Sequence, residues 1–86
     1  MKKINLDFEI IDLDGKLTGQ KVGKALANIL AIQSKGDPLK FMTWAMAFNA
    51  GQTVELDPTD IQTLKTFVSE NEQMTNFLKY PILTLL

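Results

Sequence analysis

The sequence contains no cysteine, no histidine and no arginine among its 86 residues. Without cysteine it cannot form disulfide bonds, and without histidine it cannot build imidazole metal sites or Ser-His triads. No apolar run approaches the roughly 20 residues that a membrane-spanning helix requires, so we expect no contact with a membrane. The first residues alternate in polarity and contain no apolar segment of about 7–15 residues, so we expect no signal peptide and a cytoplasmic location.

What the chain does contain predicts a single folded domain spanning residues 1–86. Apolar residues make up 45% of the sequence, and nine lysines stand against ten acidic residues, for a net charge of −1. A chain of this length buries only about 60–65% of the surface that its unfolded form exposes, which leaves little material for an enclosed substrate cavity. We therefore expect a protein that is not an enzyme and that takes neither a cofactor nor a small-molecule substrate.

Alternating polarity predicts a β-strand near the N-terminus, over residues 4–10, with one covered face. The apolar positions of this strand are Ile4, Leu6, Phe8 and Ile10. Asp14-Gly15 follows and favours a tight turn, because glycine readily supplies the positive φ that hairpin turns need. Residues 16–18 can then return as the second strand of a hairpin.

From about residue 19 the apolar residues recur with the period of a helix. The stripe consists of Val22, Leu26, Ile29 and Leu30. Thr18 is the expected N-cap of this first helix, and Gly36 is expected to end it in a left-handed conformation.

Asp37-Pro38 and Asp57-Pro58 predict the starts of a second and a third helix, since an Asp N-cap and a proline at the first helical position both favour helix initiation. The second helix is expected to reach about Ala50 and to end at Gly51. Residues 53–56 between the two helices read as a short extended segment.

The third helix is expected to bury Ile61, Leu64, Phe67 and Val68. Leu56 and Ile61 are placed to form a hydrophobic staple at its start. A last helix is expected over residues 75–85, where Pro81 should kink or shorten it. The expected fold class is therefore α+β: an N-terminal β-hairpin, to which residues 53–56 can add a third short strand, packed on three or four short helices.

No residue is assigned to catalysis, to a metal or to a cofactor. Asp12-Leu13-Asp14-Gly15 faintly resembles a calcium loop, but the positions that should carry glycine and a bidentate glutamate hold Leu17 and Gly23. A hairpin turn explains the same residues. Asp37 and Asp57 are explained by capping, and a catalytic carboxylate would need a buried cleft to tune its pKa.

The second helix is the most informative segment, because its apolar arc is wider than one packed face requires. Leu39, Met42, Ala45 and Met46 fall on one side, and Phe41, Trp44 and Phe48 widen the arc. Two interpretations stand equally: a subunit or partner interface, or a central core helix in which methionine fills gaps. The C-terminal leucines support the interface, because chain ends fray unless they are held. The candidate interface residues are Phe41, Trp44, Phe48, Leu85 and Leu86.

Lysines gather in the first part of the chain, which raises the alternative of a nucleic-acid-associated regulatory protein that uses the lysines of the first helix. These are Lys2, Lys3, Lys16, Lys21, Lys24 and Lys35. Such a surface could bind phosphates without sequence preference. The absence of arginine, the commonest specific reader of guanine, and an isoelectric point near 5.2 both favour a solvated face instead.

Several segments together resemble small bacteriophage and prophage proteins, some of them encoded among structural genes. They are Gly-Asp-Pro-Leu-Lys-Phe-Met-Thr-Trp-Ala at 36–45, Val-Glu-Leu-Asp at 54–57, Asp-x-x-x-Leu-Lys-x-Phe-Val at 60–68 and Asn-Phe-Leu-Lys-Tyr-Pro-Ile-Leu at 76–83. The resemblance implies a phage or mobile-element origin and the cytoplasm of a bacterial host, and it transfers no functional residue. The expected function is a noncatalytic protein-interaction module, with a protein partner or self-association, that assists assembly or modulates a host protein.

Overall fold

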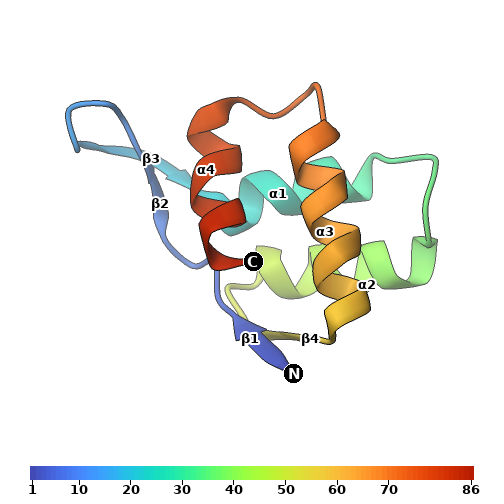
Figure 1. The fold of residues 1–86 in the computed structure, drawn as a ribbon. Coiled ribbons are helices and arrows are strands. Elements are labelled where there is room, and N and C mark those ends of the chain that lie inside the picture. Colours follow the sequence, from blue (N-terminus) through green and yellow to red (C-terminus); the bar gives the residue numbers. More distant parts are fainter.

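The computed structural model describes residues 1–86 and has an α+β fold of four helices and two small antiparallel sheets (Figure 1). The strands are β1 (Lys2–Ile4), β2 (Glu9–Ile11), β3 (Leu17–Lys21) and β4 (Val54–Leu56). The helices are α1 (Val22–Ala31), α2 (Pro38–Asn49), α3 (Pro58–Glu70) and α4 (Asn76–Leu85). The predicted fold class is confirmed. None of the helices has the length and apolarity needed to cross a bilayer.

The predicted N-terminal strand is broken into two, and its halves belong to different sheets. β1 pairs with β4, with Lys3 opposite Glu55, whereas β2 pairs with β3 as the predicted hairpin. Asn5 causes the break: its side-chain oxygen accepts a hydrogen bond from the Asp7 amide at 2.8 Å, which turns the backbone. The extended segment at residues 53–56 therefore adds its strand to β1, not to the hairpin.

The hairpin turn at Asp12 forms as predicted. The Asp12 carboxylate accepts hydrogen bonds from the backbone amides of Asp14 and Lys16, both at 2.9 Å, and Gly15 takes a φ of 80°. The structure therefore assigns this carboxylate to the turn.

The first helix is shorter than predicted at both ends. Thr18 does not cap it: Thr18 lies in β3, and its hydroxyl donates to the Ile10 carbonyl oxygen across the hairpin. The first amides of α1, those of Val22 and Gly23, instead donate to the carbonyl oxygens of Phe8 and Leu6 at 2.8 and 3.0 Å. Backbone from the broken strand thus replaces a side-chain cap.

The far end of α1 also departs from the prediction. The helix ends at Ala31, and Gly36 lies in the following loop with a φ of 94°. A Cβ atom on Gly36 would stand 2.8 Å from the ring of Phe41. Gly36 therefore permits the loop to pass close to α2, and it does not cap α1.

The starts of α2 and α3 are as predicted. The Asp37 carboxylate accepts from the amides of Leu39 and Lys40, and the Asp57 carboxylate accepts from the Asp60 amide at 2.7 Å. The last helix also forms where it was expected. Pro81 does not shorten α4, which continues through it to Leu85.

One apolar core joins the elements, and its members come from β1, β2, β4 and all four helices. No polar or charged side chain is buried. β3 contributes no buried residue, so the hairpin of β2 and β3 stands out from the helices, as Figure 1 shows.

Candidate functional site

The candidate interface residues of α2 lie inside the core of the chain itself. Phe41 and Trp44 are only 8% and 6% exposed, and Phe48 is fully covered. The Phe41 ring stacks on Trp44, with ring centroids 5.8 Å apart, and meets the ring of Phe67 edge-on. Of the two interpretations that the sequence left open, the burial of this face of α2 agrees with the core helix, and Phe41, Trp44 and Phe48 are not exposed to a partner.

The two C-terminal leucines differ from each other. Leu86 is buried in the core, whereas Leu85 is partly exposed. Leu85 lines a groove that no pattern in the sequence indicates.

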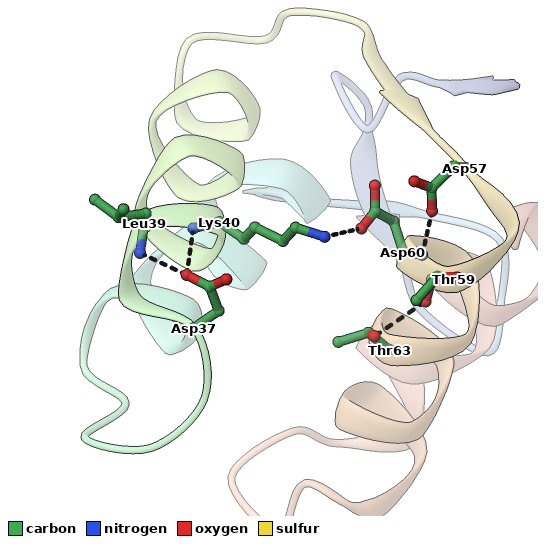
Figure 2. A network of polar contacts seen from close by, with 7 residues as sticks. All are labelled: Asp37, Leu39, Lys40, Asp57, Thr59, Asp60 and Thr63. Carbon is green, nitrogen blue, oxygen red and sulfur yellow. Dashed lines mark hydrogen bonds and ion pairs between the residues drawn. The ribbon is translucent and has the colours of Figure 1, made fainter.

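The main polar network of the helices joins the starts of α2 and α3 (Figure 2). The Lys40 ammonium lies 2.7 Å from the Asp60 carboxylate, which is mostly covered. The hydrogen bond and charge of Asp60 raise the pKa of Lys40, and the hydrogen bond from Lys40 lowers the pKa of Asp60. Both shifts move the groups away from neutral pH, where a general acid or base needs its pKa. We interpret this pair as a structural tie between two helices.

A groove of about 930 Å³ opens between the hairpin and α4. One wall comes from the end of the broken strand and the hairpin turn, through Phe8, Ile11 and Leu13. The other wall comes from α4, whose lining residues are Asn76, Phe77, Tyr80, Pro81, Thr84 and Leu85. The last five of these six positions follow a helical spacing, so they form one continuous face.

Large apolar side chains stand exposed around this groove. Leu13 is 92% exposed and Tyr80 is 73% exposed, and Ile11 and Phe77 are about half exposed (52% and 45%). An apolar surface of this kind is typical of a binding site when it is contiguous and rimmed by polar groups.

The only charged side chains that line the groove are two carboxylates, those of Glu9 and Asp12. Neither forms an ion pair within the chain. Lys16 is also part of the hairpin turn but does not line the groove. The groove can therefore take apolar side chains along its floor and a cation at its rim.

A second exposed apolar surface lies on the outer face of α2. It consists of Leu39, Met42 and Met46, and we call it the α2 ridge. Leu39 is 81% exposed and Met46 is 62% exposed. Leu39, Met42 and Met46 share one side of the helix, as their spacing in the sequence indicates, whereas Ala45, expected on the same side, is buried in the core.

The lysines of the alternative nucleic-acid hypothesis are spread over several elements, and α1 itself carries only Lys24. Four of the six bond to the chain's own oxygen atoms. Lys2 donates to the Leu86 oxygen, Lys3 pairs with Glu55, Lys21 pairs with Asp7, and Lys24 donates to the Asn49 oxygen. A phosphate would have to compete with these partners, which gives the hypothesis little support.

Comparisons of the chain with protein-family models, with curated proteins and with solved structures found no match.

Proposed function

We propose that the chain is a noncatalytic protein-interaction module that binds a partner protein in the groove between the hairpin and α4. The observation that carries this proposal is the exposed apolar lining, contributed by two elements far apart in the sequence. Covering apolar surface is favourable by about 25 cal/mol per Å², so these side chains supply a driving force for association. The resemblance to phage proteins supports a role in assembly or in modulating a host protein.

A protein segment fits the groove better than a small ligand does. Small-molecule sites usually bury most of their ligand and fix it with a few convergent polar groups. Here several of the lining side chains are exposed to solvent, and both carboxylates belong to the hairpin wall and do not converge from two sides. An amphipathic helix bound in a groove buries its apolar face and leaves its polar face exposed to solvent, so it suits an open groove of this kind.

The proposal is tested by titrating the isotope-labelled protein with a 14-residue amphipathic helical peptide that carries leucine on one face and lysine beside it. The backbone amide signals of Ile11, Phe77 and Tyr80 are expected to shift on binding. A matched peptide with glutamate in place of lysine should bind about two- to thirtyfold more weakly, because Glu9 and Asp12 attract cations and exposed ion pairs contribute about 0.2–1 kcal/mol each.

Two variants of the hairpin provide a matched control. Leu13→Ser removes an exposed leucine that lines the groove, and Leu17→Ser removes an exposed leucine of the same hairpin that does not. Only the first should weaken peptide binding. Equal loss in both variants, or signals that shift only outside the groove, would contradict the proposal.

A further inference from the structure

The molecule carries two exposed apolar surfaces, and they lie at its opposite ends. Figure 1 shows the hairpin at one end and the start of α2, which carries Leu39 and Met42, at the other. A single copy therefore cannot place its α2 ridge in its own groove. Apart from Met1, Leu17 and Ile32, every large apolar side chain that the structure leaves exposed belongs to one of these two surfaces.

We infer that the partner in the groove is a second copy of this chain, which inserts its α2 ridge. This inference rests on the proposed function, because it names the occupant of the same groove. A single kind of contact then covers both exposed surfaces.

The two surfaces agree in form and length. The α2 ridge presents residues at positions i, i+3 and i+7 of a helix, the spacing by which amphipathic helices dock in grooves. At a rise of 1.5 Å per residue, the ridge from Leu39 to Met46 is about 10 Å long. The groove wall on α4, from Phe77 to Leu85, is about 12 Å long by the same rise. Methionine side chains adapt to irregular surfaces, which suits Met42 and Met46 to this contact.

The charges also agree. α2 contains no acidic residue, and its one lysine, Lys40, is paired with Asp60 on α3. Lys35 lies just before α2, is exposed, and forms no ion pair within the chain. Together with Met42 it lines a small hollow of about 90 Å³ beside the ridge.

The ridge would dock with the start of α2 toward the hairpin, because this orientation brings Lys35 toward the two carboxylates of the groove, Glu9 and Asp12. The nearest acidic residue of the ridge side, Asp37, is engaged with the amides of Leu39 and Lys40. The contact joins Lys35 and Glu9, neither of which forms an ion pair within its own chain. Asp12 adds a second negative charge beside Glu9, although its carboxylate also accepts two amide hydrogen bonds within the turn.

Because the two surfaces differ, the contact is head-to-tail. Each copy would offer one groove and one ridge, so association continues beyond the dimer into rings or open chains. Each surface is small, which predicts weak association, with a dissociation constant on the order of 10 μM to 1 mM.

The test is sedimentation velocity of the wild-type chain from about 20 μM to about 1 mM, the range set by the expected weak contact. The mean mass is expected to rise with concentration and to pass that of a dimer. Tyr80→Glu blocks the groove and Met46→Glu blocks the ridge, so each variant alone should stay monomeric. Leu17→Glu makes the same charge change at an exposed position in neither surface and should associate like the wild type.

The decisive sample is an equimolar mixture of Tyr80→Glu and Met46→Glu. The intact ridge of the first can enter the intact groove of the second, so the mixture should form a one-to-one dimer and nothing larger. Circular dichroism melts that match the wild type establish that both variants fold. If the wild type associates but the mixture stays monomeric, the head-to-tail contact is wrong.

Failure of this inference can be told apart from failure of the proposed function. A wild-type chain that stays monomeric at 1 mM overturns the second copy as partner. If the lysine peptide still shifts the amides of Phe77 and Tyr80 in that monomer, the groove binds another protein and the proposed function stands. If the peptide does not bind either, both proposals are wrong.

Discussion

Replacement of Gly23 by alanine tests the packing of α1 against its neighbours. Gly23 lies in the first turn of α1, where it is buried and its φ is not positive. A Cβ atom there would stand 2.8 Å from the Phe48 carbonyl oxygen and 3.1 Å from the Leu6 carbonyl oxygen, against an ordinary contact of 3.4–4 Å. Both obstacles are backbone atoms, so neither can move away without shifting α2 or the segment between β1 and β2.

Two effects of opposite sign compete in this variant. Alanine is favoured over glycine inside a helix by about 0.5–1 kcal/mol, because it loses less backbone freedom on folding. An added methyl group in a packed core typically costs about 1–3 kcal/mol. Since the helix must move by several tenths of an ångström to admit the methyl, we expect the second effect to win. Gly23→Ala should lower the free energy of unfolding by about 1–2 kcal/mol, the excess of the packing cost over the helix preference.

Urea denaturation followed by circular dichroism measures this change. With a slope near 1 kcal/mol per M for a small domain, the midpoint should fall by roughly 1–2 M while the slope stays the same. Gly15→Ala is a useful comparison, because Gly15 has a positive φ and open space around it, so any loss there comes from backbone strain alone. A Gly23→Ala protein as stable as the wild type would refute the close packing.

Other predictions concern the caps, the core and the ion pair. Asp57→Ala should cost about 1 kcal/mol by removing the cap of α3, and an increase in stability on urea denaturation would contradict that role. Leu64→Ala should cost about 2–5 kcal/mol in the same assay, because Leu64 is fully buried and its loss leaves a cavity. Asp60→Asn should remove the ion pair with Lys40, whose contribution is present above the ordinary Asp pKa of 3.8 and is lost as the pH falls through the lowered pKa of Asp60. At alkaline pH the contribution of the ion pair is present below 10.5, the ordinary pKa of Lys, and is lost as the pH rises through the raised pKa of Lys40. The difference in stability between the variant and the wild type, measured across this pH range, should therefore vanish at both extremes.

The elements that could be predicted are those whose signals are local. Asp37-Pro38 and Asp57-Pro58 contain both the capping oxygen and the favoured first helical residue, and α2 and α3 begin there. The turn at Asp12 is equally local, since its carboxylate bonds to amides two and four residues ahead. Such signals need no knowledge of the rest of the chain.

The start of α1 and the break in the first strand could not be predicted in this way. Asn5 is fixed by bonds to the Gly51 oxygen and the Thr53 hydroxyl, more than 40 residues away in the sequence. Once Asn5 turns the backbone, the carbonyl oxygens of Leu6 and Phe8 point at the first amides of α1 and replace the expected cap at Thr18. Only the tertiary fold brings these groups together.

The candidate site shows the same limit. The apolar pattern of α2 establishes that two of its sides are apolar, but the partner helix decides which side is buried, and α1 covers the side with Phe48. The groove is even harder to predict from the sequence, because its walls come from two distant segments, residues 8–13 and 76–85. Nothing in the sequence indicates that Tyr80 and Leu13 line the same groove.

The exposed positions of the groove and of the α2 ridge lie outside the core that folds the chain. β3 contributes no buried residue, and Leu13, Tyr80 and Met46 are each more than half exposed. Changing such side chains removes little buried area, so it should leave the free energy of unfolding within about 0.5 kcal/mol, as at other exposed sites. Phe41 and Trp44, by contrast, serve the core, and their removal would unfold the protein before it could report on binding. Binding and folding can therefore be separated experimentally at the first set of positions and not at the second.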